Sequence, residues 1–207
     1  MISRRDLLKQ MGVAGAVAAM PMAHAAAQQG APVAPPAFET LTATEAAILE
    51  AAVARIIPSD ESGPGAKESG AAHYIDRALA GPLATSRPAY AAGLAALDAY
   101  ARTSKGGPFA TLAPGDQDAV LADVESNKAT GFTPSGSSFF SLLRGHTIEG
   151  TFADPYYGGN ANFAGWDLIG YPGVRVSVAP AEQQMNVAIA PNHKSVYDFG
   201  MFNKATK

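Results

Sequence analysis

The chain has 207 residues, of which 47% are hydrophobic and 16% charged, with 21 glycines, 15 prolines, no cysteine and a net charge of −3. This is the composition of a globular protein rather than a disordered or collagen-like chain, and nucleic-acid binders carry more lysine and arginine. A chain without cysteine forms no disulfide, attaches no haem c covalently, ligates no iron–sulfur cluster and has no thiol nucleophile.

Residues 1–25 have the three parts of an export signal. A basic head with the paired arginines Arg4 and Arg5 precedes an uncharged stretch over residues 11–23, and Ala23-His-Ala25 matches an A-x-A cleavage pattern. The stretch is shorter than the roughly 20 residues of a membrane span, so we expect no permanent anchor. The two arginines, followed by Leu-Leu-Lys, favour the twin-arginine pathway over an ordinary secretory signal.

A flexible leader rich in proline and alanine is expected over residues 26–41. The first helix is expected to start behind Thr42, which forms a capping box with Glu45, and to end before Pro58. The helix start therefore marks the beginning of the folded domain.

Four further helices are expected from apolar residues at helical spacing and from capping residues. They cover residues 71–80, 86–106 with Ser86 as cap, 114–124 and 134–150. Gly150 is expected to end the last of them. Five short helices without alternating strands predict a mainly α domain over residues 42–173 and argue against a nucleotide-binding sheet domain.

The sequence changes character at residue 150. Residues 150–173 are rich in glycine and aromatic residues, and each glycine costs about 1 kcal/mol in a helix relative to alanine. We therefore expect a long ordered loop here. Residues 174–207 form an irregular C-terminal extension, in which residues 174–178 could make a short strand.

Sequence motifs for catalysis or cofactor binding are absent. The chain lacks the glycine patterns G-x-G-x-x-G, G-x-x-x-x-G-K-[ST] and G-x-S-x-G, which serve dinucleotides, phosphates and serine nucleophiles. His73, His146 and His193 have no close-spaced metal ligand. We accordingly predict no catalytic, cofactor-binding or metal-binding residue in this chain.

The densest group of polar residues is Arg144, His146, Glu149 and Asp154, at the end of the fifth helix. His146 and Glu149 are three residues apart and can interact on one helix face. The group could enter a partner's site or a substrate pocket. We favour the alternative, in which it orders the loop that follows.

Aromatic residues gather just beyond, with Trp166, Tyr156, Tyr157, Phe163 and Tyr171 in one short stretch. Burial in the chain's own core is the first expectation for these rings. A protein interface is the second, because Trp and Tyr are frequent at interface hot spots, and sugar stacking is the third.

Several uncommon segments occur together with the twin-arginine head. They are residues 57–66, 70–76, 139–144, 147–150, 154–160 and 165–173. In this combination the chain resembles the gluconate 2-dehydrogenase subunit 3 family over residues 42–173, while residues 174–207 lie outside the resemblance.

The resemblance implies a small subunit, without a cofactor of its own, of a periplasmic or membrane-associated dehydrogenase. In that family the catalytic partner is an FAD-containing large subunit of the glucose–methanol–choline type, often accompanied by a cytochrome c subunit with haem c. The chain would help the large subunit mature and export it through the twin-arginine translocase. The large subunit would determine which sugar or sugar acid is oxidised.

Two hypotheses follow for the residues near the end of the fifth helix. As a partner interface they would comprise Arg144, His146, Glu149, Asp154, Tyr156, Gly158, Gly159, Asn160 and Trp166. As an independent periplasmic sugar-binding module or enzyme, the chain would instead use Arg144, His146, Glu149, Asp154 and Trp166.

Overall fold

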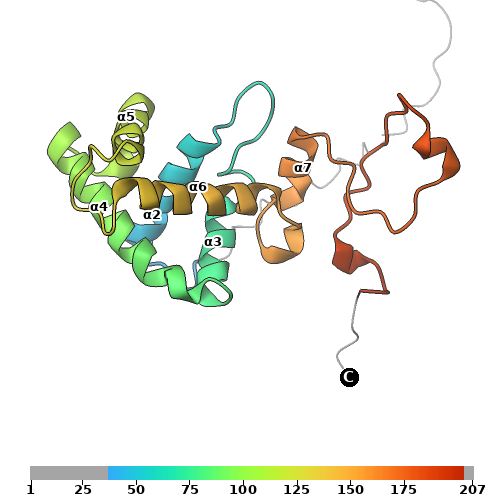
Figure 1. Cartoon of the computed structure of the whole chain (residues 1–207), viewed down its shortest axis with the longest axis horizontal. Helices are drawn as coiled ribbons and strands as arrows, with labels where there is room; N and C mark the ends of the chain where they lie inside the picture. The colour runs from blue at the N-terminus through green and yellow to red at the C-terminus, as the bar shows by residue number, and fades with distance from the viewer. Residues whose placement is uncertain (1–36, 203–207) are drawn as a thin grey trace, which may run out of the picture. The chain divides into compact units, whose positions relative to one another are not determined.

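The computed structural model describes residues 37–202. The expected export signal with Arg4 and Arg5, and the leader up to residue 36, lie outside the described residues. Within residues 37–202 the chain forms α-helices and short 3₁₀-helices with no β-strand, which confirms the mainly α fold (Figure 1). None of the helices in this range is both long enough and apolar enough to cross a bilayer.

Five of the α-helices lie where the sequence predicts helices, and a short one follows in the loop region. Their bounds are α2 (Ala43–Ile56), α3 (Ala71–Ala80), α4 (Arg87–Lys105), α5 (Pro114–Glu125), α6 (Gly136–Phe152) and α7 (Ala164–Leu168).

Helix α2 starts with the expected capping box. Thr42 accepts a hydrogen bond from the Glu45 amide at 3.3 Å, and the Glu45 carboxylate accepts one from the Thr42 amide at 2.9 Å. Arg87 at the start of α4 pairs with Glu45 at 2.7 Å. Ser86, however, makes no side-chain cap, because it ends a 3₁₀-helix (Ala84–Ser86) that runs directly into α4.

The core lies between α6 and the helices on either side of it. Helix α6 packs against α3 and α5, and α2 contacts α3, α4, α5 and α6. The apolar side chains expected at helical spacing fill this space. The largest fully buried apolar ones are Leu49, Val53, Ile75, Tyr90, Leu94, Leu97, Phe109, Val120, Val124 and Leu143.

Helix α6 does not end at Gly150, as the sequence suggests, but continues to Phe152. A Cβ at position 150 would lie 2.9 Å from Ala71 Cα and 3.0 Å from its carbonyl oxygen on α3. Glycine therefore permits a close helix contact here and is not a stop signal.

The region after α6 is more ordered locally than a loop. It contains the 3₁₀-helices Pro155–Tyr157 and Ala161–Phe163 and then α7, so the expectation that its glycines exclude any helix is wrong. The short strand expected over residues 174–178 is absent as well. Arg175 instead binds Glu182 at 2.8 Å and the carbonyl of Ala190 at 2.6 Å.

The last residues assigned to the leader are packed rather than free. The Asp76 carboxylate on α3 accepts hydrogen bonds from the amides of Glu39, of Thr40 at 2.9 Å and of Leu41 at 2.9 Å. Phe38 stacks on His73, with ring centroids 4.4 Å apart. The folded domain therefore starts before residue 42.

Candidate functional site

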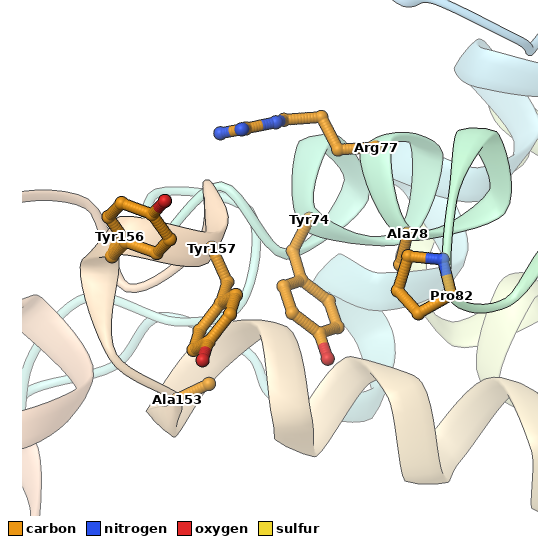
Figure 2. Close-up of a pocket in the computed structure, with 7 residues that line it drawn as sticks. All are labelled: Tyr74, Arg77, Ala78, Pro82, Ala153, Tyr156 and Tyr157. Atoms are coloured by element: carbon orange, nitrogen blue, oxygen red, sulfur yellow. The ribbon is translucent and has the colours of Figure 1, made fainter. Parts of the chain in front are cut away.

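A pocket of about 330 Å³ lies between α3 and the turn that follows α6 (Figure 2). Its walls are mainly aromatic and apolar, with one cationic side chain. It is lined by Tyr74, Arg77, Ala78, Pro82, Ala153, Tyr156 and Tyr157. The volume is at the lower end of the range typical of ligand pockets.

Two of the pocket tyrosines are held by the turn after α6. Asp154 accepts a hydrogen bond from the Tyr156 amide at 2.9 Å and another from the Val196 amide at 2.9 Å. Tyr197 of the C-terminal extension stacks on Tyr156 at a centroid distance of 3.8 Å, and its hydroxyl lies 3.1 Å from that of Tyr157. The extension thereby fixes the ring positions on one side of the pocket.

Arg77 comes from the opposite wall, on α3. Its side chain extends toward the turn that carries the two tyrosines (Figure 2). A Cβ at position 158 would lie 2.9 Å from both Cδ and Nη1 of Arg77, and Gly158 has φ 95°, a conformation that favours glycine. Gly158 is therefore the residue that lets the arginine lie across the turn.

Tyr74 connects the pocket to α6. Its hydroxyl donates to Glu149 Oε2 at 3.1 Å. Burial, together with the negative charge of Glu149, raises the pKa of Tyr74 to about 12. The phenol therefore stays protonated at neutral pH and keeps its donor role.

His146 lies one turn before Glu149 on α6, on the buried side of the helix. Its Nδ1 is 3.0 Å from the hydroxyl of Tyr90, and the two rings stack at 5.8 Å. Burial lowers the pKa of His146, and the charge of Glu149 offsets this only in part. Burial also raises the pKa of Tyr90, so both groups are neutral at neutral pH and share one hydrogen bond, whose direction depends on the tautomer of the imidazole.

We expect this pair to make the fold sensitive to acid. A histidine whose folded pKa is lowered binds its proton more readily when unfolded, so the free energy of unfolding falls once the pH drops below about 6.5. One such proton changes it by at most about 1.4 kcal/mol per pH unit. Urea titrations between pH 7.5 and 5 should show this loss of stability. His146→Gln should remove the part of the pH dependence that is due to His146 and leave the part that is due to other titratable groups.

The family comparison covers the helical domain and the turn after it. The sequence model of Gluconate 2-dehydrogenase subunit 3 matches residues 43–173, more than half of the chain. The chain belongs to the gluconate 2-dehydrogenase subunit 3 family. No curated protein and no solved structure matches it significantly. Membership makes the chain a subunit of a multi-subunit dehydrogenase complex, and the match confirms the resemblance seen in the sequence.

In this member of the gluconate 2-dehydrogenase subunit 3 family, the polar group of α6 does not converge on one site. Arg144 lines a groove with α2 and α5, His146 contacts Tyr90 and Glu149 contacts Tyr74. Asp154 caps the turn after α6. Successive residues of a helix point in different directions, which is why residues close in sequence separate here.

Three expected interface residues lie inside the domain. Asn160 is fully buried, donates to the Ala153 carbonyl at 2.9 Å and accepts from the Gly165 amide at 2.8 Å. A Cβ at Gly159 would overlap the carbonyl of Gly150. Trp166 is 5% exposed and donates to the Phe152 carbonyl at 2.8 Å. These residues hold the segment after α6 against the helix end.

The sequence patterns do not reveal most of the pocket. Of the residues that line the pocket, only Tyr156 is among the expected interface residues. Tyr74 and Arg77 are three residues apart on α3, a spacing that places them on one helix face, but nothing in the sequence pairs that face with the turn after α6. Among residues 37–202, no group of three acidic or histidine side chains is placed to hold a metal ion.

Proposed function

We propose that the chain is the non-catalytic small subunit of an FAD-dependent sugar or sugar-acid dehydrogenase whose large subunit is of the glucose–methanol–choline type. It assists maturation of that flavoprotein and carries it through the twin-arginine translocase to the periplasm. A cytochrome c subunit with haem c is a further proposed member of the complex, and any association of the chain with the membrane is proposed to come through the complex. Family membership supports a role as a subunit, and the finer assignments are those that the sequence resemblance implies.

The distribution of exposed apolar side chains is the observation that carries a partner-binding role. Within residues 37–202, every exposed large hydrophobic residue lies between Ile148 and Phe202, and the helices before that point expose none. They are Ile148, Tyr156, Tyr157, Ile169, Tyr171, Val176, Val178, Met185, Val187, Met201 and Phe202. Such a concentration is typical of a surface that a partner covers.

The C-terminal part of the described chain is accordingly the contact region that we propose. A stable contact buries at least about 1,000 Å² in total, which requires more than the turn after α6 alone. The extension beyond residue 173 contributes many of the exposed side chains. This extension lies outside the residues that the family model matches, as expected for a segment that makes a contact specific to this complex.

The alternative of an independent sugar-binding module or enzyme loses its support. That hypothesis depends on Arg144, His146, Glu149, Asp154 and Trp166 meeting at one site. In the structure Arg144 lines a separate groove, His146 is buried against α4 and Trp166 packs under the segment after α6. The aromatic pocket next to Arg77 uses none of the five in its lining.

Co-expression of the large subunit under three conditions tests the proposal. With the full chain we expect FAD-loaded large subunit in the periplasm. Without the chain, or with Arg4→Lys and Arg5→Lys together, we expect at least a tenfold decrease, because the translocase reads the arginine pair. Immunoblots of the periplasmic fraction and the fluorescence of released FAD measure the two effects.

A further arm separates export from maturation. A large subunit fused to its own twin-arginine signal should reach the periplasm in cells that lack the small chain, but with less bound FAD. Equal amounts of exported, FAD-loaded enzyme in all cells would contradict the proposal.

A further inference from the structure

Arg77 differs from the other arginines of residues 37–202. Four of them form ion pairs, Arg55 with Asp118, Arg87 with Glu45, Arg102 with Asp98 and Arg175 with Glu182. Arg144 makes no ion pair there either, but it shares its groove with Asp118 and Glu125.

No acidic side chain lines the pocket at Arg77, and Arg77 has no counter-ion within the described residues. The two carboxylates next to the pocket have other partners: Glu149 accepts from the Tyr74 hydroxyl, and Asp154 accepts from the amides of Tyr156 and Val196. A guanidinium beside three phenol rings is therefore left without an anion.

The side chains that line the pocket determine which chemical groups it can bind. A guanidinium presents two parallel N–H donors that match a carboxylate, and such charge-assisted bonds are among the strongest in proteins. The rings of Tyr74, Tyr156 and Tyr157 offer apolar surface to whatever carries that carboxylate. Tyrosine and arginine are also, with tryptophan, the residues enriched at binding hot spots.

We propose that this pocket receives an acidic side chain of the large subunit, whose carboxylate binds Arg77 while the three tyrosines cover its stem. The inference deepens the proposed function and depends on it. Tyr156 and Tyr157 belong both to the pocket and to the exposed apolar residues that mark the contact region. The pocket is thus continuous with the surface that a partner covers, and charge complementarity favours an anion next to Arg77.

The pocket is held in shape before a partner arrives. Asp154 fixes the turn by two amide hydrogen bonds, Tyr197 stacks on Tyr156, and Gly158 admits the Arg77 side chain. Groups that are already positioned lose less conformational entropy on binding, which favours a tight and specific contact. The C-terminal extension takes part in this through Tyr197.

The test measures the affinity of purified large subunit for the full chain, by biolayer interferometry at two salt concentrations. We expect Arg77→Ala to raise Kd at least tenfold and Arg77→Glu at least a hundredfold. Arg77→Lys keeps the charge but loses the bidentate geometry, so its Kd should lie between wild type and Arg77→Ala. Arg102→Ala is the matched control, because this exposed arginine pairs only within α4.

Folding and binding are separated within the same experiment. Arg77 is exposed and unpaired among the described residues, so Arg77→Ala and Arg77→Lys should unfold at nearly the same urea concentration as wild type. Arg77→Glu puts a negative charge in the last turn of α3 and should unfold at a slightly lower urea concentration, but this effect of the helix dipole is too small to unfold the chain. Tyr156→Ala, on the other wall, should weaken the complex without a change of charge. If the wild-type chain forms no complex, the proposed function fails. If it binds and Arg77→Glu binds equally well, only the inference fails.

A small-molecule acid is the competing occupant. Calorimetry of the isolated chain with sodium gluconate and sodium benzoate examines this directly. Saturable binding that Arg77→Ala abolishes, together with an unchanged affinity for the large subunit, would overturn the inference. Absence of such binding, with a weakened complex, supports it.

Discussion

Replacing Asp76 by alanine is expected to lower the free energy of unfolding by about 3 kcal/mol or more. Asp76 is 1% exposed and accepts hydrogen bonds from the amides of Glu39, Thr40 and Leu41, and from the Thr40 hydroxyl at 2.7 Å. The bond from Leu41 is buried and those from Glu39 and Thr40 are partly buried. A buried donor that loses its partner costs about 1–3 kcal/mol and a partly buried one costs less, so together they account for the expected loss. Urea denaturation followed by circular dichroism measures the change.

The acid dependence of this effect has a definite sign. Burial alone would raise the pKa of Asp76, but the hydrogen bonds from Glu39, Thr40 and Leu41 outweigh it and hold the pKa below its usual value. A carboxyl group with a lowered folded pKa stabilises the fold above its unfolded pKa of about 3.9 and loses this effect on further acidification. The difference in the free energy of unfolding between wild type and Asp76→Ala should therefore have its full value at pH 7 and decrease below about pH 4.

Asp118→Ala provides the matched control. Asp118 is also a hydrogen-bonded carboxylate, but its partner is the Arg55 side chain at 2.6 Å and its own side chain is 49% exposed. Exposed ion pairs contribute about 0–1 kcal/mol, so the control should change stability little. Asp76→Asn preserves the volume of the side chain and one acceptor oxygen. Its loss of stability should lie between those of Asp76→Ala and Asp118→Ala. Equal stability of Asp76→Ala and Asp118→Ala would show that the residues before α2 are not anchored by this carboxylate.

The sequence predicts the helices of this chain well because their signals are local. Apolar spacing, the Thr42–Glu45 capping box and prolines at helix starts place α2 to α6 within a few residues. Gly150 was misread because a glycine that ends a helix and one that permits a close helix contact look alike in sequence. Only the approach of Ala71, from another helix, distinguishes the two.

The candidate site was less predictable because its contacts join distant parts of the chain. Asp76 holds residues more than thirty positions earlier, and Arg77 faces a turn that follows a different helix. From the sequence, the polar residues near the end of α6 are expected either to order the loop that follows, which is the favoured interpretation, or to share one partner surface or substrate site. Helix geometry disperses those residues. Tyr74, Tyr156 and Tyr157 lie in segments that the sequence singles out, 70–76 and 154–160, but nothing in the sequence indicates that these two segments meet in one pocket.

Gly165→Ala is expected to displace the segment after α6 and to lower the free energy of unfolding by about 3 kcal/mol. A Cβ at this position would overlap the carbonyl oxygen of Thr151 on α6 and lie 3.1 Å from Asn160 Oδ1. The neighbouring atoms are backbone or are buried and hydrogen-bonded, so they cannot move aside cheaply, and overpacking costs about 1–3 kcal/mol or more. Urea denaturation measures the total loss.

The expected loss of structure in Gly165→Ala is local, which distinguishes it from a general destabilisation of the fold. Asn160 donates to Ala153, and Trp166 donates to Phe152, so both hydrogen bonds should weaken when the segment shifts. Hydrogen exchange should accelerate over residues 154–171 before it does so in α2 to α5. Because Tyr156 and Tyr157 belong to this segment, affinity for the proposed large-subunit partner should fall as well.

Gly145→Ala is the same substitution within α6, at a glycine whose Cβ would meet no atom within 4 Å. Here alanine should stabilise the protein by about 0.5–1 kcal/mol, since glycine is the poorer helix former. If the free energy of unfolding falls for Gly165→Ala and rises for Gly145→Ala, Gly165 is required by the close contact with Thr151 rather than by its own backbone freedom. If Gly165→Ala unfolds and exchanges like wild type, the close contact between α7 and α6 does not exist in solution, and the pocket tyrosines need another support.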